Sequence, residues 1–475
     1  MFMDKLKKFF GAQDMTRGKP FTRIFMFAMP LLVGNIAQQL YNTVDSIVVG
    51  KFVGDEALAA VGATMPVFNL IIVMFSAVAT GAGIMVAQYF GAREKGNLSR
   101  TVGNAMVLTL FVSVLMTALG LLIVRPLLRL LRTPENILEM SATYMTILIS
   151  TMVFCAYYNI FAGILRGVGD AVMPLVFLLI ACVLNIFLDI LFVAAFHWGV
   201  AGVAWATVIS QCVSGILCVF RLTRMRDRIH FTRNIFKLRG SIVKRMLKLG
   251  VPSGITMAIF SLASIAVQSL VNSFGTAVMS CAVMIMRVDG FAMMPNFTFG
   301  MAMSTFTGQN IGAGRMDRVN KGVSQGLLLS LSFSVALTVC ILLFGSSLLG
   351  LFTNTPEIID MGMRMMRILA VGYVAMAVTQ VLNGTMQGAG DTLTPMMISI
   401  ITTVALRVPI AYTLAWLTRT EAMPQGDPSC LYWSLLISWT IGAVFSSVMF
   451  RVGKWRKRAI VSAVPVPADS LDGGD

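Results

Sequence analysis

The sequence predicts an all-α polytopic membrane protein with twelve transmembrane helices. Three observations support this fold class: the composition, the length of the apolar segments and an internal repeat. Of the 475 residues, 57% are hydrophobic and only 12% are charged, unlike any soluble domain. Many apolar segments exceed the roughly 20 residues that a helix needs to cross a bilayer. A β-barrel is excluded, because its strands alternate polar and apolar residues over about 10 positions.

Twelve apolar segments follow one another along the chain, and each is long enough for one membrane crossing. The second and eighth are longer than the others, which tilting or protrusion would accommodate. The expected spans are residues 23–49, 56–88, 99–124, 137–163, 171–196, 199–222, 243–273, 277–310, 319–347, 358–384, 392–417 and 430–453.

The net charge of +16 comes from basic residues near both ends of the chain and in its middle. Such residues are typical of loops that face the cytoplasm. Because the number of spans is even, we expect both termini in the cytoplasm. No aromatic and basic platform accompanies the charge, so nucleic-acid binding is not expected. The expected domains are a basic cytoplasmic N-terminal segment (1–22), an N-terminal six-helix bundle (23–222), a basic cytoplasmic linker (223–242), a C-terminal six-helix bundle (243–454) and a cytoplasmic tail (455–475).

An internal repeat is the strongest sign of how the spans are organised. Four motifs of the first half return in the second half at one nearly constant offset, and each half contains six spans. Two six-helix bundles related by a pseudo-two-fold axis along the membrane normal are therefore expected, and transporters built this way bind substrate between the halves. The repeated motifs are Pro30 and Pro252, Gln88–Ala92 and Gln309–Ala313, Thr133-Pro-Glu and Thr355-Pro-Glu, and Arg166-Gly-Val-Gly-Asp170 and Gln387-Gly-Ala-Gly-Asp391.

The repeated residues have local structural explanations. Thr133 and Thr355 each precede a proline, as an N-cap residue precedes a proline at the first helical position. The two Gly-x-Gly-Asp turns are expected to end one helix and to start the next. We therefore expect function where the two halves differ.

Two acidic residues within the spans of the first half have no acidic counterpart in the second. Asn185 and Asp189 are four residues apart, so a helix places them on one face. Their counterparts in the second half are Leu406 and Ile410, and the counterpart of Asp45 is Val267. A carboxylate near the bilayer centre costs roughly 2.5–3.5 kcal/mol on insertion scales, so it is expected to face protein, water or an ion.

Further polar side chains accompany these acids. Gln38, Tyr41, Asn42 and Asp45 form one helical stripe, and Asn159 and Thr207 add oxygens in the fourth and sixth spans. Two carboxylates with amide and hydroxyl oxygens suit Na⁺, or a carboxyl pair that takes up a proton. The alternative is that these groups only satisfy one another within the bundle.

The second half has a different set of charges, Arg287, Asp289 and Arg407. Their counterparts in the first half, Pro66, Phe68 and Ile186, are uncharged. We interpret the set as a buried ion pair or triad. The alternative is that Asp289 or Arg407 faces a cavity and handles substrate or protons.

No feature indicates an enzyme or a cofactor. The seven cysteines show no Cys-x-x-Cys spacing, and neither a zinc-binding His-Glu-x-x-His motif nor a nucleophile elbow occurs. The glycines of Gly91–Gly96 lack the Lys-Ser/Thr ending of a phosphate-binding loop.

The chain resembles the multidrug and toxic compound extrusion (MATE) family over almost its whole length. The resemblance implies two six-helix bundles that export mainly cationic, amphipathic organic compounds in exchange for Na⁺ or H⁺. It also implies alternating access in a bacterial cell membrane, and we expect a functional monomer. The matching features are Pro30 and Pro252, Tyr41-Asn-Thr-Val-Asp45, the Gly-Ala pairs at 91–92 and 312–313, and Arg166-Gly-Val-Gly-Asp170 with its repeat.

Within that family the chain is most similar to the prokaryotic DNA-damage-inducible branch. This resemblance places the Na⁺ or H⁺ site on Asp45, Asn185, Asp189 and Thr207, with Tyr144 and Asn159 in the surrounding network. Another branch uses acids in its seventh and tenth spans. Here Phe260 lies near the first of these positions and no acid occurs between Met361 and Gly390, so that second type of site is not expected.

Two other classes of function stay open at this point. A flippase for a lipid-linked precursor would share the repeat architecture, and Arg287 and Arg407 are the only residues that suggest a basic cavity. A membrane receptor or integral enzyme is disfavoured by the repeat and by the missing catalytic motifs.

Overall fold

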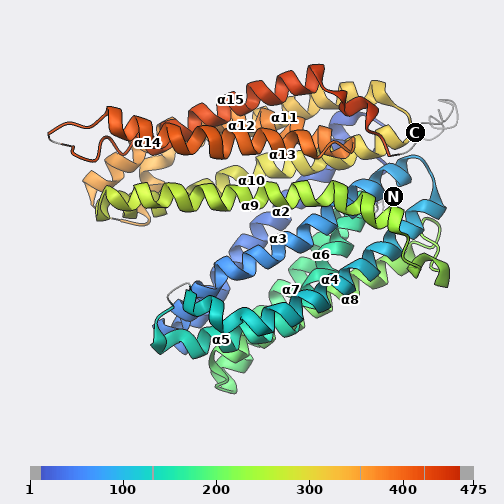
Figure 1. The fold of residues 1–475 in the computed structure, drawn as a ribbon, viewed down its shortest axis with the longest axis horizontal. Helices are drawn as coiled ribbons and strands as arrows, with labels where there is room; N and C mark the ends of the chain where they lie inside the picture. The colour runs from blue at the N-terminus through green and yellow to red at the C-terminus, as the bar shows by residue number, and fades with distance from the viewer. Residues whose placement is uncertain (1–11, 131–132, 354, 422, 461–475) are drawn as a thin grey trace, which may run out of the picture. The chain divides into compact units, whose positions relative to one another are not determined.

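The computed structural model describes residues 12–460 apart from 131–132, 354 and 422, so the outer parts of the expected terminal segments lie outside the described residues. Every regular element of the described residues is helical (Figure 1). The elements are α2 (Pro20–Val48), η1 (Val49–Val53), α3 (Asp55–Gly91), α4 (Lys95–Leu130), α5 (Glu135–Ser150), α6 (Met152–Gly167), α7 (Val172–Asp189), η2 (Ile190–Ala195), α8 (Gly199–Arg224), η3 (Arg233–Phe236), α9 (Gly240–Ser273), α10 (Thr276–Gly312), α11 (Met316–Gly350), α12 (Pro356–Gly388), α13 (Leu393–Ser399), η4 (Ile400–Leu406), α14 (Arg407–Leu417), α15 (Cys430–Val452) and η5 (Lys454–Lys457).

Each expected span coincides with one helix or with consecutive helical segments. Among the described residues, 11 helices are long and apolar enough to cross a membrane. The bent pair α5 and α6 supplies a twelfth span. The prediction of an all-α polytopic membrane protein is confirmed.

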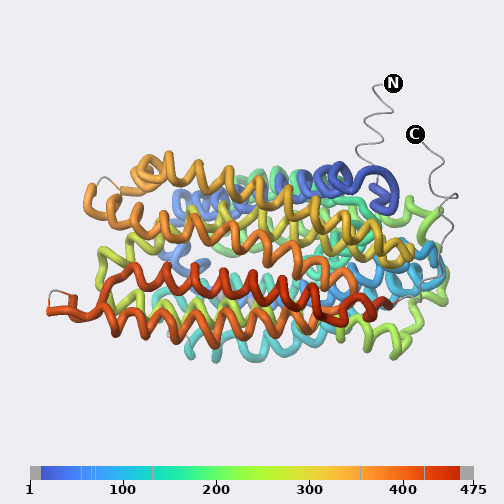
Figure 2. Tube along the Cα trace, turned by 90° about the horizontal axis from the view of Figure 1, so that it is seen from above, coloured from blue at the N-terminus to red at the C-terminus, as the bar shows by residue number. Residues whose placement is uncertain are grey.

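The described residues divide into two compact units. Unit 1 comprises Met29–Gly254 together with the described residues up to Asp14. Unit 2 comprises Met15–Ala28 together with the described residues from Ile255 onward. The expected bundle boundaries fall within two or three residues of the ends of α2, α8 and α9, whereas the units divide α2 and α9 further inside. Figure 2 shows the long helices of unit 2 running alongside one another.

The sequence repeat returns as a repeated helix contact. In unit 1, a Cβ added to Gly163 would lie 3.0 Å from the Ala79 carbonyl oxygen, and one added to Gly167 would lie 2.8 Å from the Gly83 carbonyl oxygen. These glycines therefore let the backbones of α6 and α3 approach closely, as small residues four apart do in membrane helices.

Unit 2 repeats this contact with α12 and α10. Gly384 and Gly388 are the repeat counterparts of the two glycines of α6, and a Cβ on either would collide with the carbonyl oxygen of Gly300 or Ser304. Four positions of the repeat are thus explained by backbone packing.

The Gly-x-Gly-Asp turns work as expected in both units. Gly169 and Gly390 have positive φ angles of 86° and 95°, which suit glycine. The Asp170 carboxylate accepts a hydrogen bond from the main-chain N of Met173 at 3.1 Å, and so does Asp391 from Thr394 at 3.2 Å. Each aspartate therefore satisfies one amide at the start of the next helix.

Each turn aspartate also pairs with an arginine of its own unit. Arg221 lies 2.8 Å from Asp170, and Arg458 lies 3.1 Å from Asp391. Burial raises the pKa of Asp170, and the neighbouring guanidinium of Arg221 opposes that effect.

The expected N-cap residues are half correct. Thr355 occupies the N-cap of α12 with Pro356 at the first helical position, although its side chain makes no capping hydrogen bond. For Thr133 the prediction is wrong: Pro134 takes the N-cap position and Glu135 begins α5. The helix starts one residue later there because Pro134 is extended, with ψ at 142°.

The fourth span is broken, whereas its counterpart α12 is continuous. The break between α5 and α6 bends the span by 52°. At this point the Thr151 hydroxyl donates to the Ile147 carbonyl at 2.7 Å, where its counterpart in α12 is Gly372. A threonine that bonds back to the preceding turn is a common cause of such bends.

Adding a methyl group at a close backbone contact tests the repeated packing. We expect Gly384→Ala to lower the free energy of unfolding by about 1–3 kcal/mol, because the helices must separate to admit the Cβ. The measurement is thermal unfolding of the purified protein. Gly290→Ala is the matched control, since a Cβ there meets no atom within 4 Å. Equal melting temperatures of the two variants would contradict the close approach of α12 and α10.

Candidate coupling site

Asp45 and Asp189 meet inside unit 1. Asp45 lies near the end of α2 and Asp189 is the last residue of α7, with exposed fractions of 6% and 0%. Their carboxyl groups are close enough to form a side-chain hydrogen bond with each other. Because an ionised carboxylate only accepts hydrogen bonds, a bond between two carboxyl groups requires one shared proton.

Asn185 holds the second carboxyl in place. With its amide oriented to satisfy both ends, its nitrogen donates to Asp189 Oδ2 at 2.8 Å, and its oxygen accepts from the main-chain N of Thr207 at 3.1 Å. The amide therefore links α7 to α8 through the acid. The expected grouping of Asn185 with Asp189 on one face is found in the structure.

Two tyrosines complete the polar side of the site. The phenol of Tyr41 lies within hydrogen-bonding reach of the Thr207 side chain and near both acids. Tyr144 of α5 is buried and also lies near Asp45 and Asp189. These groups can hydrogen-bond to a carboxyl or to a bound cation.

An apolar cluster surrounds Tyr144 and excludes water from one side of the site. It includes Val49, Val193, Val203 and Val208, all at most 7% exposed. In such surroundings, an electrostatic interaction is stronger than in water, and an unsatisfied charge is more costly. The Oδ1 atoms of Asp45 and Asp189 are buried and make no hydrogen bond among the described residues.

Both acid-bearing helices become π-helical within four residues after the acid. The π-helical segment η2 begins at Ile190, one residue after Asp189, and η1 begins at Val49, four residues after Asp45. Single π-helical turns within longer helices are rare and occur frequently at functional sites.

The remaining residues of the expected network lie further out. Gln38 and Asn42 are exposed, so only the Tyr41 and Asp45 part of the polar stripe turns inward. Asn159 is half-buried, and its amide donates to the Cys155 carbonyl of its own helix at 2.9 Å. The structure therefore does not join Asn159 directly to the acids.

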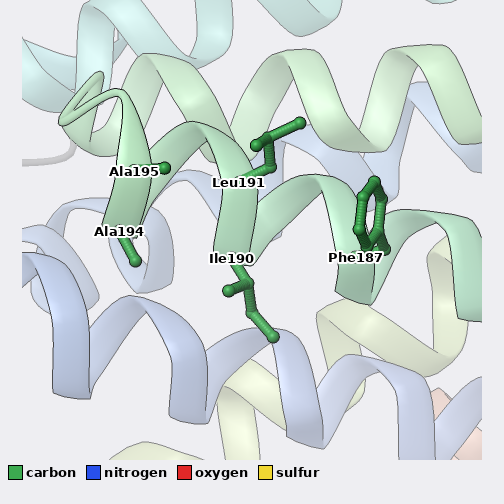
Figure 3. Close-up of a pocket in the computed structure, with 5 residues that line it drawn as sticks. All are labelled: Phe187, Ile190, Leu191, Ala194 and Ala195. Carbon is green, nitrogen blue, oxygen red and sulfur yellow. The ribbon is translucent and has the colours of Figure 1, made fainter.

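An apolar pocket lies on the same helix as Asp189. Its volume is about 340 Å³, and Figure 3 shows Ile190 and Leu191 pointing to opposite sides of the segment. No polar side chain lines it, so it offers contact area without charge recognition. The lining residues are Phe187, Ile190, Leu191, Ala194 and Ala195.

A second polar cluster lies in unit 2. The Tyr373 hydroxyl donates to Asp289 Oδ1 at 2.9 Å, and Arg407 interacts electrostatically with that carboxylate. Arg407 Nε is buried without a hydrogen bond among the described residues. Arg287 is exposed on α10, which does not support a buried triad of Arg287, Asp289 and Arg407.

Sequence reasoning missed Tyr373 and Tyr432, which both lie near Asp289. A signal was present, because their counterparts in the first half are Met152 and Gln211. A comparison of the two halves restricted to charged residues could not reveal a tyrosine.

Twelve membrane spans in two sequence repeats, with a carboxyl pair buried in one of them, define a polytopic membrane transporter. A family model described as MatE matches residues 30–191 and 252–413. The two matched stretches are equal in length, and the second follows the first at the offset of the sequence repeat. The chain belongs to the MatE family, and is therefore a transporter rather than an enzyme.

Relatives cover nearly the whole chain. The "Probable multidrug resistance protein YoeA" of Bacillus subtilis is 31% identical over 421 residues, which cover 87% of this chain and 91% of the relative. The "Probable multidrug resistance protein NorM" of Thermotoga maritima is 26% identical over 444 residues, covering 92% and 94%.

Solved structures share the fold. A crystal structure of MATE in the bent conformation has a TM-score of 0.86 and 25% identity, covering 92% of this chain and 96% of that one. An outward-facing multidrug resistance MATE transporter of the MOP superfamily has a TM-score of 0.85 at 25% identity, with the same coverage.

Replacing Asn185 by the residue of its repeat counterpart tests its role. We expect Asn185→Leu to cost about 1–3 kcal/mol of stability, because Asp189 Oδ2 loses its amide donor inside an apolar region. Thermal unfolding measures the loss. The matched control is Asn159→Leu, whose amide bonds only within its own helix; an equal loss in that control would contradict a special contact at Asp189.

Proposed function

We propose that this protein is a secondary active antiporter that exports organic, cationic and amphipathic compounds in exchange for H⁺ or Na⁺. The observation that carries the proposal is that the buried carboxyls of Asp45 and Asp189 lie within hydrogen-bonding reach of each other. Curated relatives named as multidrug resistance proteins support the export of organic compounds. The buried acids are the reason to propose that these compounds are cationic.

The carboxyl pair gives a physical reason for exchange. With one shared proton the pair carries one negative charge, and without it the pair carries two. An organic cation binds the doubly ionised pair more strongly, because it compensates like charges held close together. Binding of the coupling ion and binding of the substrate therefore oppose each other, as antiport requires.

The hydrogen bonding of the site favours H⁺ over Na⁺ as the coupling ion. Within the described site, the Asn185 amide oxygen accepts from the Thr207 main-chain N, and the Tyr41 phenol lies within hydrogen-bonding reach of the Thr207 hydroxyl. Asp45 and Asp189 then retain two oxygens without a hydrogen-bond partner. A hard cation prefers about six oxygen ligands, so Na⁺ binding requires Asn185 and Thr207 to turn toward the acids.

Coupling to transport then follows from differential affinity. The ion shifts the protein between outward-open and inward-open states only to the extent that it binds one state more tightly. The π-helical segments after both acids are the local elements that could change with protonation. In this proposal the protein works as a monomer in a bacterial cell membrane, with both termini cytoplasmic and the DNA-damage-inducible branch as its subfamily.

The charges of unit 2 have a supporting role in this proposal. Arg407 is compensated by Asp289, which Tyr373 fixes through its hydroxyl. Tyr373 is itself buried and packed against the Trp439 ring, with centroids 6.1 Å apart. Such compensation argues against a strongly basic, pyrophosphate-binding cavity, which a flippase for lipid-linked precursors would need.

Neutralising either acid of the pair tests the proposed function. We expect Asp45→Asn and Asp189→Asn to reduce efflux of a fluorescent organic cation from cells to the level of cells without the protein, because neither variant can alternate between one and two charges. Efflux is measured at matched expression in the membrane.

Asp227→Asn is the matched control, since it neutralises an acid in an exposed loop. It should retain most of the efflux. Normal efflux by both Asp45→Asn and Asp189→Asn would exclude the pair as the coupling site. Proteoliposomes with separate pH and Na⁺ gradients identify the ion: a pH gradient alone should drive counterflow, and a strict need for Na⁺ would contradict proton coupling.

A further inference from the structure

The chain between α8 and α9 is held firmly against α4 in unit 1. The Asn104 side chain of α4 forms three hydrogen bonds with this segment. Its amide oxygen accepts from the main-chain N of Arg239 at 2.8 Å. Its amide nitrogen donates to the carbonyls of Ile235 at 3.2 Å and Lys237 at 3.3 Å. Gly103 allows the approach, because a Cβ there would collide with the Ile235 carbonyl oxygen. The linker is thus a positioned structure.

Alternate parts of this linker face inward and outward. Ile229 and Ile235 are buried, with exposed fractions of 0% and 4%. The His230 main-chain N donates to Ser99 Oγ at 2.9 Å, which fixes the linker before the 3₁₀ turn η3. Because these anchors consume the inward positions, the side chains between them are directed to the surface.

The outward side chains are basic. Residues 221–248 contain ten Lys and Arg but one acid, Asp227. Arg233, Lys237 and Arg239 are exposed and close together in the sequence. No acidic residue occurs between Arg233 and Arg239 to compensate their positive charges, so this part of the surface attracts anions.

Large apolar side chains are exposed among the same cations. Phe231, Phe236 and Leu238 have exposed fractions of 37%, 41% and 47%. A purely apolar contact surface would not explain the cations. A site for soluble anions alone would not explain the exposed phenylalanines. Aromatic and aliphatic side chains beside Lys and Arg are typical of segments that lie at a membrane interface.

We propose that this surface, formed by Phe231, Arg233, Phe236, Lys237, Leu238 and Arg239, docks on anionic phospholipid headgroups of the surrounding bilayer. The linker joins the ends of two candidate spans, so it lies where a span leaves the membrane. The cations contact the phosphates, and the apolar side chains enter the boundary between headgroups and acyl chains. Each basic residue contributes a factor of about five to the affinity for an anionic surface.

Hydrogen exchange of the full chain in nanodiscs tests the docking. Amides of residues 230–238 should exchange at least about tenfold more slowly in phosphatidylglycerol than in phosphatidylcholine. The triple variant Arg233→Gln, Lys237→Gln, Arg239→Gln should lose this difference between the two lipids at every fraction of phosphatidylglycerol in the nanodisc. The reason is that three cations together contribute about a hundredfold to the affinity for an anionic surface. Unchanged exchange in helices outside the linker shows that the variant is folded.

Two further samples separate lipid docking from other causes. The triple variant Arg364→Gln, Arg367→Gln, Arg419→Gln removes three exposed cations from unit 2 and should keep the wild-type protection. The double variant Phe231→Ser, Phe236→Ser keeps every charge and should weaken the protection.

Three results would overturn the proposal. One is equal exchange of the wild-type linker in both lipids. Another is protection in phosphatidylcholine on addition of inorganic phosphate alone, which would indicate a soluble anion as the ligand. The third is full protection in the Phe231→Ser, Phe236→Ser variant, because a purely ionic attraction would then suffice.

Discussion

The close approach of the buried Asp45 and Asp189 carboxyls is the constraint on which the candidate site of unit 1 depends. It brings the end of α2 to the end of α7, and a hydrogen bond between the two groups requires one proton because neither ionised carboxylate can donate. Asn185 fixes Asp189, and Tyr41 lies within hydrogen-bonding reach of Thr207 beside the pair. The valine-rich cluster on the other side increases the effect of the pair's charge on its neighbours, because an apolar environment strengthens electrostatic interactions.

This asymmetric site sits on a symmetric scaffold. Gly163 and Gly384 perform the same task in their units, allowing one helix backbone to approach another, and the two turn aspartates each start a helix and bind an arginine. By contrast, the counterparts of Asn185 and Asp189 are Leu406 and Ile410. The first half therefore carries an ionisable group at a position where the second half carries an apolar one, while both halves keep the same helix packing.

The sequence predicts the spans well because an apolar run of about 20 residues has few alternatives in a membrane. The repeat offsets likewise predict the Gly-x-Gly-Asp turns and suggest the acids as a site. They cannot predict that the helices turn π-helical after Asp45 and Asp189, because such a turn is set by tertiary packing rather than by a sequence pattern; η1 and η2 contact each other in the structure. Nor could they show that Gln38, Asn42 and Arg287 are exposed, or that Tyr373 binds Asp289, since charge alone does not define which face of a helix is buried.

Proton release on substrate binding tests the shared proton most directly. Purified wild-type protein in weakly buffered solution should release up to one proton per molecule when a transported organic cation is added, and the release should fall as pH rises and the proton is already lost. Asp45→Asn and Asp189→Asn should release none while remaining folded. Release of the same number of protons by either variant, or cation binding by the wild type with no release at any pH, would contradict a coupling proton held between the two carboxyls.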